Sequence, residues 1–373
     1  MTNKELFYFT GKCLMLDEHP GFKQEIIEMI AFDSIDWENF VACCSNHLIV
    51  PVIYLKFQLH GIIEYLPEEL SEFLKEIYDL NVLRNTQILE QLHDITGVLN
   101  NDNIYPVFLK GAGNLLDGLY SDIGERMLGD IDFLVPEKDW LPAVKILENE
   151  GYSAEITMPR NFDIGSFKHY PRMSNPGFPA PLEIHRLPVN ERHQSWFNPC
   201  IIDQEKKTVT ALNGCYVQSE YHKIIHNFIH AQLDHNYHTY GIVSFRDLYD
   251  LCLLSKRTAI QQTIMGIKSK QKAIAYFVFA GKALGLNERF YAGSSFSAWL
   301  FSEKHDLNLR SATFYYTYRS IIFIAQRIFI GYIGQFIKSF YSQKVRQSVV
   351  NRLSDRQWYR AHFNSYAVFF FSK

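Results

Sequence analysis

Residues 105–136 interrupt an otherwise helix-patterned chain with two short strand-like segments. Tyr105–Leu109 is a short apolar run, and Asp130–Val135 alternates acidic with apolar residues before Pro136 closes it. Alternation with a period of two is typical of a half-buried strand, whereas apolar spacing of three and four indicates a helix. The sequence therefore predicts an α+β fold, in which a small mixed sheet is flanked by helices.

The change of pattern divides the 373 residues into three regions. We expect a helical N-terminal region (1–95), a compact α+β core (96–215) and a helical C-terminal region (216–373). In the first region, Val82–Leu99 is predicted to form a long helix whose apolar face includes Leu83.

A small-residue turn follows the first strand of the core. Lys110–Gly113 comes directly after Tyr105–Leu109, and Asn114–Tyr120 has a helical pattern. Free backbone N–H groups in such a turn, together with the helix dipole, favour a phosphate. The turn is not a P-loop, because its Lys precedes the glycines. Asp139 is expected to cap the next helix, Trp140–Glu150.

Asp130 and Asp132 are the strongest candidates for chemistry. Side chains two apart on a strand share one face, so both carboxylates point the same way. Adjacent carboxylates repel each other and are costly to desolvate, and a divalent cation relieves both costs. Oxygen ligands of this kind suit Mg²⁺, with Mn²⁺ as an alternative. The competing interpretation is a solvated strand edge or a helix cap.

A second pair of strands supplies a third carboxylate. Phe167–Met173 and Leu182–Leu187 read as strands joined by the turn-forming segment Ser174–Gly177, so we expect a hairpin. If the second of these strands pairs beside Asp130, Glu183 joins the two aspartates, and three carboxylates can hold two metals. The alternative is a surface glutamate on a hairpin. His185 shares the face of Glu183 and either orients a ligand or is an ordinary packed or exposed histidine.

Two cations are candidates for phosphate contacts. Lys110 and Arg126 lie close in sequence to the turn and to the aspartates, and either could neutralise phosphate charge. Ordinary surface solvation is the alternative for both residues.

The stretch FLKGAGNLLDGLYSDIGERMLGDIDFLVP, residues 108–136, together with LEIH at 182–185, resembles a known family. It looks like the nucleotidyltransferase superfamily of the DNA polymerase beta type. More narrowly, it resembles the bacterial uncharacterised nucleotidyltransferases found near polysaccharide and peptide-modification genes. The resemblance covers roughly residues 80–255, including Arg84–Asn85 and Arg246–Leu248, and it implies that the core is a nucleotidyltransferase domain.

The resemblance implies roles for individual residues. Asp130 and Asp132 would bind Mg²⁺, Glu183 would be the third acidic residue, and Gly111 and Ala112 would line the triphosphate turn. The superfamily's usual Gly-Ser turn is Gly-Ala here, so one hydroxyl contact to phosphate is missing.

The implied reaction is transfer of an NMP group from an NTP to an acceptor, with release of pyrophosphate. The sequence does not identify the acceptor, which could be a small molecule, a glycan precursor, tRNA or protein. A catalytically degenerate nucleotide- or partner-binding protein is one alternative. A toxin-like transferase acting on tRNA or protein is another.

Histidines at 222, 226 and 230 fall at helical spacing, which could align them for zinc. No carboxylate or cysteine completes an obvious site, so a helix packed near the cleft is the competing interpretation.

Composition indicates a cytoplasmic setting. The net charge is −3, which gives no nucleic-acid footprint for the chain as a whole. The six cysteines form no CxxC pair, as expected in a reducing compartment. The N-terminus has no signal-peptide pattern. Arg327 interrupts the longest apolar run, Ser320–Ile337, so no transmembrane helix is expected.

The C-terminal tail is strongly basic. From Leu307 onward there are ten basic residues, and Asp355 is the one acidic residue. Residues 318–341 combine Arg, Lys and Gln with Ile, Phe and Tyr as a basic amphipathic helix. Such a helix packs against the protein, lies peripherally on the inner membrane surface, or binds a nucleic-acid or protein partner.

Overall fold

The computed structural model divides into two compact units, Met1–Lys304 and His305–Lys373. The larger unit contains a mixed seven-stranded sheet with helices around it, which confirms the predicted α+β fold. The boundaries expected at residues 95 and 215 stay predictions. The residues that the structure describes are 1–155, 167–287, 289–293 and 295–371.

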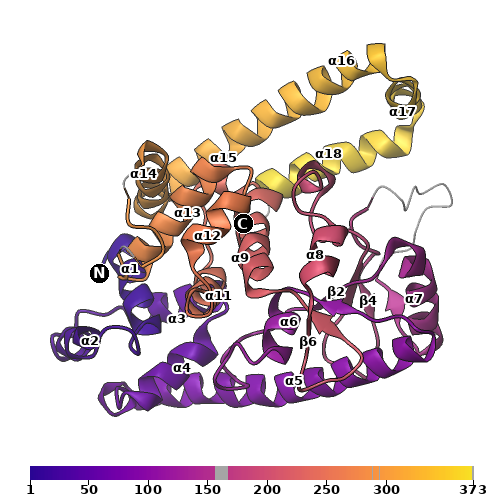
Figure 1. Cartoon of the computed structure of the whole chain (residues 1–373). Coiled ribbons are helices and arrows are strands. Elements are labelled where there is room, and N and C mark those ends of the chain that lie inside the picture. Colours follow the sequence, from indigo (N-terminus) through magenta and orange to yellow (C-terminus); the bar gives the residue numbers. More distant parts are fainter. Residues whose placement is uncertain (156–166, 288, 294, 372–373) are drawn as a thin grey trace. The chain divides into compact units, whose positions relative to one another are not determined.

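The N-terminal region is helical, as expected (Figure 1). Thr2 begins the first helix with a capping box, in which its hydroxyl accepts from the Glu5 N–H and the Glu5 carboxylate accepts from the Thr2 N–H. The elements are α1 (Asn3–Leu14), α2 (Gly21–Ala31), α3 (Trp37–Asn46), α4 (Val50–Leu59) and the 3-10 helix η1 (Ile63–Tyr65).

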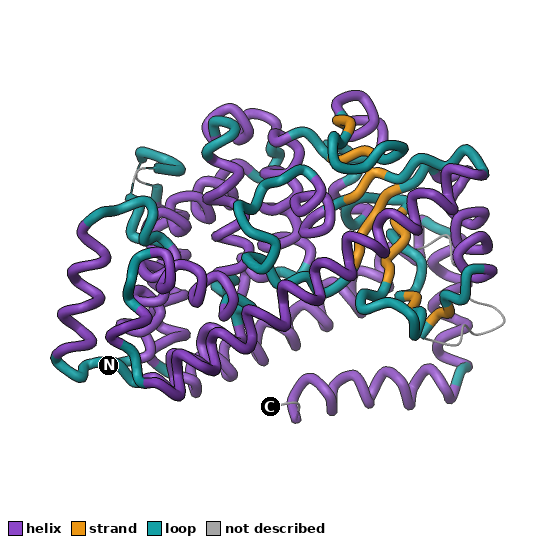
Figure 2. The backbone as a smooth tube through the Cα atoms, turned by 90° about the horizontal axis from the view of Figure 1, so that it is seen from below, coloured by secondary structure: helices purple, strands orange, loops and turns teal. Residues whose placement is uncertain are grey.

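The long helix α5 (Glu68–Asn101) runs alongside the sheet (Figures 1 and 2). Its C-terminal half buries apolar residues such as Ile88 and Leu92 against the core. The placement of Leu83 on the apolar face is wrong, because its side chain is 58% exposed. Asn81 and Asn85, two positions away and thus on the opposite side of the helix, are buried instead.

The sheet has the strand order β3-β4-β5-β2-β1-β7-β6. Its central strands β2 and β5 run parallel, and β1 lies antiparallel to β2. The β4–β5 pairing is antiparallel, which confirms the expected hairpin. The strands are β1 (Val107–Phe108), β2 (Ile131–Leu134), β3 (Ser153–Ala154), β4 (Met173–Ser174), β5 (Leu182–His185), β6 (Lys207–Thr208) and β7 (Tyr216–Val217).

Strand alternation separates an apolar face of the sheet from a polar one. Ile131, Phe133 and Ile184 belong to the hydrophobic cluster that α5, α6 (Lys110–Leu116) and α7 (Glu137–Asn149) form with the sheet. Asp132 and Glu183 are the intervening residues, so they point to the opposite face. The apolar cluster holds the two strands in register and thereby positions the acidic side chains.

Several element boundaries differ from the sequence predictions. Helix α6 begins at Lys110, not Asn114, because Lys110–Gly113 forms the first turn of the helix and the Gly113 N–H already donates to the Leu109 carbonyl. Helix α7 begins at Glu137 after Pro136, which places Asp139 inside its first turn, where it cannot be the cap.

The strand expected over Phe167–Met173 is also shorter. Regular strand covers only Met173–Ser174, with an isolated bridge from His169 to His185. Pro171 lies between them, and proline cannot donate to a strand ladder.

The rest of the larger unit is mainly helical. Ser219 caps α9 by accepting from the His222 N–H. The elements are the 3-10 helix η3 (Glu191–His193), α8 (Pro199–Glu205), α9 (Glu220–Phe228), the π-helix η4 (Ile229–Asp234), α10 (Tyr237–Tyr240), α11 (Phe245–Ser255), α12 (Ile260–Gly266) and α13 (Lys270–Ala283). Helix α14 (Phe296–Arg310) begins in the larger unit and ends in the smaller one.

The C-terminal unit contains a helix that is continuous over Ala312–Tyr341. It is long and apolar enough to cross a membrane by length and composition, and none of its most apolar window is buried. No transmembrane helix is expected from the sequence, because Arg327 interrupts the apolar run. By length and composition this helix nevertheless qualifies as a candidate membrane span. Its parts are α15 (Ala312–Gln326), the π-helix η5 (Arg327–Ile333) and α16 (Gly334–Tyr341), followed by α17 (Gln343–Ser354) and α18 (Arg356–Phe371).

Candidate active site

Strand pairing brings two of the predicted acidic residues side by side. Asp132 on β2 is the register partner of Glu183 on the parallel strand β5. The pairing on which the sequence interpretation of Glu183 depended is thus present. Asp130 lies just before β2, at the same end of the strand.

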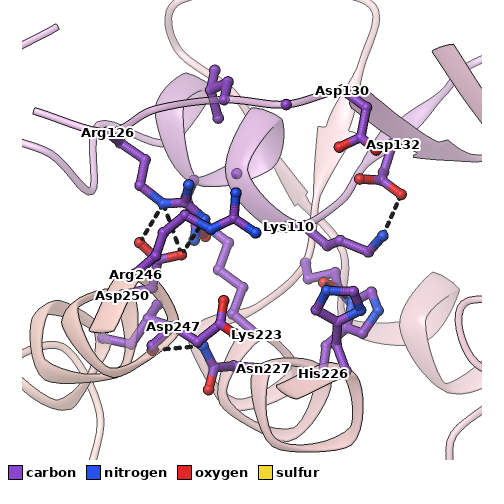
Figure 3. A pocket seen from close by; sticks show the side chains of 17 residues that line it. Lys110, Arg126, Asp130, Asp132, Lys223, His226, Asn227, Arg246, Asp247 and Asp250 are labelled. Carbon is purple, nitrogen blue, oxygen red and sulfur yellow. Dashed lines mark hydrogen bonds and ion pairs between the residues drawn. The ribbon is translucent and has the colours of Figure 1, made fainter. Parts of the chain in front are cut away.

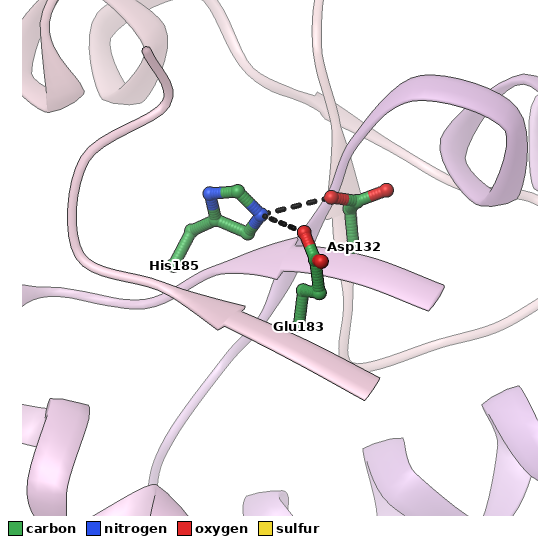
Figure 4. Close-up of side chains that lie close together, drawn as sticks. All are labelled: Asp132, Glu183 and His185. Atoms are coloured by element: carbon green, nitrogen blue, oxygen red, sulfur yellow. Dashed lines mark hydrogen bonds and ion pairs between the residues drawn. The ribbon is translucent and has the colours of Figure 1, made fainter. Parts of the chain in front are cut away.

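A histidine joins this pair. Among the described residues, Asp132, Glu183 and His185 place their ligand atoms within 4.8 Å of one another (Figure 4). His185 Nε2 lies 2.8 Å from Asp132 Oδ1 and 3.5 Å from Glu183 Oε2. Carboxylate oxygens and an imidazole nitrogen at this spacing are suitable ligands for a divalent metal ion.

The two aspartates have pKa shifts of opposite sign. Burial raises the pKa of Asp130, and the neighbouring charge of Asp132 raises it further. Burial would also raise the pKa of Asp132, but Lys110 and His185 outweigh it and hold that pKa well below its ordinary value. Asp132 is therefore ionised at neutral pH, and a cation beside Asp130 would favour its ionised form as well.

Lys110 is held against the acidic group by its position at the start of α6. Its ammonium forms an ion pair with Asp132, and its side chain is 18% exposed. Lys110 has a φ of +49°, in the left-handed region that residues other than glycine seldom occupy. Such backbone strain is concentrated at functional sites, where the surrounding structure maintains it.

A cavity of about 140 Å³ opens beside the aspartates (Figure 3). Asp130, Asp132 and Lys110 line it from the sheet and α6, and polar residues of α9, η4 and α11 line it opposite them. The latter include Lys223, His226, Asn227, His230, Arg246, Asp247 and Asp250.

Several polar groups in this cavity have unused hydrogen-bonding capacity. Arg246 forms no hydrogen bond or ion pair within the described part of the chain, and its buried Nε has no partner. The buried Nδ1 of His230 and Oδ1 of Asn114 are likewise without partners. A polar ligand or water in the cavity would satisfy these atoms.

Burial keeps the two cavity histidines uncharged. It lowers the pKa of His226 and of His230 well below the ordinary value, and the nearby charge of Lys110 lowers both further. His226 also interacts through Nδ1 with Gln218 Oε1 at 3.0 Å. Each imidazole is therefore neutral at neutral pH and can serve as a hydrogen-bonding group.

The segment that leads into Asp130 is fixed from α5. Asn85 Nδ2 donates to the carbonyls of Ile123 and Arg126, at 2.6 and 2.9 Å. Arg84 Nη1 donates to the Leu128 carbonyl at 2.7 Å. These contacts explain why Arg84 and Asn85 accompany the acidic motif, because they set the path of the chain before the aspartates.

A family model described as an uncharacterised nucleotidyltransferase matches residues 33–292, more than half of the chain. The chain belongs to this nucleotidyltransferase family. No curated protein matches the chain. The family description identifies the protein as a transferase, and the acidic cluster fits that class of chemistry.

Arg126 in this nucleotidyltransferase is engaged by a partner. Its guanidinium forms a buried ion pair with Asp250, with 3.0 Å between Nη2 and Oδ2. Burial would lower the pKa of Arg126, but Asp250 outweighs it and raises that pKa. Arg126 still lines the cavity, so its predicted phosphate contact stays a prediction, with Asp250 as a competing anion.

The two small residues of the predicted phosphate turn, Gly111 and Ala112, face different surroundings. Gly111 lines the cavity, and a Cβ there would lie 2.4 Å from Leu128 Cδ2. Ala112 is 1% exposed and belongs to the apolar core. The Ala112 methyl group therefore faces the core, whereas the edge of α6 that bears Lys110 and Gly111 faces the cavity.

Sequence reasoning missed several cavity residues, among them Asn114, Gln218, Lys223 and Asp250. A signal was present, because residues 223, 226, 227 and 230 recur at three- and four-residue spacing and so share one helix face. A polar stripe on a largely buried helix would have indicated a cavity.

The zinc alternative for the three histidines finds no support in the described residues. His222 Nε2 approaches Glu205 at 3.6 Å, while His226 and His230 face the cavity beside Lys110. The group that can hold a metal lies on the sheet instead.

Proposed function

We propose that this nucleotidyltransferase is a metal-dependent enzyme of the DNA polymerase beta type, which transfers an NMP group from an NTP to an acceptor and releases pyrophosphate. The observation that carries the proposal is the pairing of Asp132 with Glu183 on adjacent parallel strands, with Asp130 and Asp132 lining a polar cavity. Mg²⁺ or Mn²⁺ bound there would offset the carboxylate charge and stabilise charge on the reacting phosphate.

The cavity suits phosphate groups better than a whole nucleotide. Its volume of about 140 Å³ is below the roughly 300–1,000 Å³ of common small-molecule sites. Lys110 and Arg246 would contact the phosphates from two sides, and Gly111 lets α6 approach them closely. The ribose and base would extend out of the cavity toward the acceptor.

Pyrophosphate release is the direct test. The purified protein would be incubated with each NTP and with Mg²⁺ or Mn²⁺, and cell lysate would supply acceptors. We expect release with at least one NTP, and we expect Asp130→Ala and Asp132→Ala each to abolish it. Asp203→Ala is the matched control, because this carboxylate is 69% exposed and lies outside the cavity.

Two other outcomes would favour the alternatives. NTP binding without pyrophosphate release, with acceptors present, would support a non-catalytic binding protein. Growth arrest on expression that is lost with Asp130→Ala would support a toxin-like transferase acting on tRNA or protein.

For the C-terminal unit we propose peripheral contact with the inner membrane surface in a bacterial cytoplasm, made through residues 318–341. Large apolar side chains such as Phe329 and Phe336 are more than 60% exposed there. Exposed apolar side chains together with an excess of positive charge are the features by which a helix lies on anionic lipid.

Vesicle sedimentation would test the membrane contact with the full chain. We expect binding to anionic vesicles, weak binding to zwitterionic ones, and a large loss of binding when Arg319, Arg327 and Lys338 are changed to Glu. Release of the cell-associated protein by alkaline carbonate would agree with peripheral contact. Retention in the membrane would instead indicate that Ala312–Tyr341 spans it.

The matched control reverses the charge of three exposed lysines in the larger unit. Changing Lys23, Lys138 and Lys145 to Glu alters the net charge equally but should leave vesicle binding largely intact, apart from a long-range effect of net charge that salt screens.

A further inference from the structure

The two ring nitrogens of His185 have different surroundings. The residue ends β5, and its side chain is fully buried. Nδ1 lies 3.2 Å from the carbonyl oxygen of Leu187. Nε2 points the other way, toward Asp132 Oδ1 and Glu183 Oε2, as Figure 4 shows.

Both ring nitrogens thus face groups that only accept hydrogen bonds, whereas a neutral imidazole has one proton to donate. With the proton on Nδ1, the ring donates to the Leu187 carbonyl oxygen. Nε2 of the same ring then presents a lone pair, and it faces two carboxylate oxygens that also only accept. Three acceptors directed at one point, with ligand atoms within 4.8 Å of one another, are satisfied by a cation.

We infer that His185 Nε2 is a direct ligand of the divalent metal, beside Asp132 and Glu183. The inference rests on the metal dependence of the proposed function and adds a nitrogen donor to its carboxylates. The Leu187 carbonyl would orient the ring, as partners of the second nitrogen do in many histidine metal sites. Asp130 stays outside the group of three and remains available to a second ion or to the nucleotide.

A nitrogen ligand changes the metal preference of the site. Mg²⁺ prefers oxygen ligands at near-ideal octahedral positions, whereas imidazole suits transition metals. A site with one imidazole and two carboxylates should therefore prefer Mn²⁺ over Mg²⁺ more strongly than the carboxylates alone would.

A proton on His185 Nε2 is the competing arrangement, because Nε2 lies 2.8 Å from Asp132 Oδ1 and would donate to it. An imidazolium would donate to the Leu187 carbonyl through Nδ1 and to Asp132 through Nε2. Its Nε2 proton would then occupy the position between the ring and the carboxylates that a metal ion would otherwise take. The two arrangements differ in whether a histidine nitrogen is bonded to the metal, which spectroscopy measures directly.

Pulsed electron paramagnetic resonance of Mn²⁺ bound to the full chain distinguishes the two. We expect ¹⁴N coupling from one directly bound imidazole in the wild-type protein. In His185→Gln this coupling should be lost, the Mn²⁺ affinity should fall by about tenfold or more, and the ratio of Mn²⁺ to Mg²⁺ affinity should fall as well. His93→Gln, at an exposed histidine on α5, should leave both the coupling and the affinities unchanged.

Three results would overturn the inference: no ¹⁴N coupling in the wild type, coupling that persists in His185→Gln, or no bound Mn²⁺ at all. Persistent coupling would assign the nitrogen to another residue such as His169, whose ring centre lies 5.0 Å from that of His185. If His185→Gln does not fold, His169→Gln decides instead: coupling that persists there excludes the His169 ring, and coupling that is lost there overturns the inference.

These measurements need no turnover. A failure to release pyrophosphate with the nitrogen coupling intact would overturn the proposed reaction and leave the ligand assignment standing. The reverse result would leave the reaction standing with a metal held by oxygen ligands only.

Discussion

Asp250 on α11 holds the Arg126 guanidinium in a buried ion pair, with 3.0 Å between Nη2 and Oδ2, and the two side chains are only 6% and 8% exposed. The same carboxylate accepts from the Tyr120 hydroxyl at 2.9 Å. Tyr120 and Arg126 both precede Asp130 in the chain, and both are thus held by a residue of α11 more than a hundred positions later. The loop that presents the aspartates is held on one side by α5 and on the other by α11.

Removing Asp250 should destabilise the protein strongly. Asp250→Ala leaves the Arg126 charge buried without its partner, and breaking a buried pair in this way costs about 3–5 kcal/mol. We expect a loss of that size in the free energy of unfolding, measured by urea denaturation. Asp79→Ala, which breaks an exposed pair with Lys75 on α5, should have little effect. Similar small effects of both changes would mean that the Arg126–Asp250 pair does not form.

Gly113 is required by the close packing of α6 on β1. A Cβ at this position would lie 2.4 Å from the Phe108 carbonyl oxygen, a backbone atom that cannot move aside alone. We expect Gly113→Ala to lower the melting temperature and to cost about 1–3 kcal/mol of stability.

Gly97→Ala is the matched control for this change, because nothing lies within 4 Å of a Cβ there. This residue is inside α5, where alanine should stabilise by roughly 0.5–1 kcal/mol relative to glycine. Equal effects of the two substitutions would contradict the packing of α6 described above.

Lys223 should make stability rise at alkaline pH. Burial lowers its pKa from 10.5 to about 8, although Asp117 opposes the shift. Below pH 8 Lys223 is protonated in both the folded and the unfolded state, and the folded state is destabilised by the buried ammonium. Between pH 8 and 10.5 the unfolded state binds more protons, so stability rises with pH, by roughly 3 kcal/mol in total.

The difference between wild type and Lys223→Met isolates this contribution. Urea denaturation from pH 7 to 10.5 should show the rise in the wild type and a smaller one in the variant. Lys207→Met removes another, more exposed cation from Asp117 and should retain most of the rise, because burial contributes more than Lys207 to the lowered pKa of Lys223. Parallel curves for wild type and Lys223→Met would rule out the pKa shift.

Lys110 should compete with the metal ion when no nucleotide is bound. Its ammonium is paired with Asp132, one of the proposed metal ligands. Lys110→Gln removes this competing charge, so we expect Mn²⁺ to bind at least about threefold more tightly in the absence of NTP. NTP affinity should fall at the same time, because a phosphate contact is lost. Calorimetric titration measures both, and a fall in Mn²⁺ affinity would contradict the competition.

Much of the fold and part of the site were predictable from local pattern. The alternation of Asp130–Val135 fixed which side chains share a face, and the hairpin chemistry before Leu182 placed Glu183 on a second strand. Element boundaries were less predictable. The start of α6 at Lys110 depends on a left-handed residue and on glycines that pack closely against β1 and Leu128, and neither shows in a local pattern.

The sequence by itself determined the class of chemistry, because closely spaced carboxylates beside a small-residue helix start are already present in one stretch of thirty residues or so. Only the tertiary structure decided which groups meet them. The register of β2 with β5 places Glu183 and His185 beside the strand that carries Asp132. Helices α9 and α11 contribute Lys223, Arg246 and Asp250 from the other side of the cavity. The physical reason is that local periodicity sets the direction of each side chain, whereas burial of apolar faces sets which elements pack together.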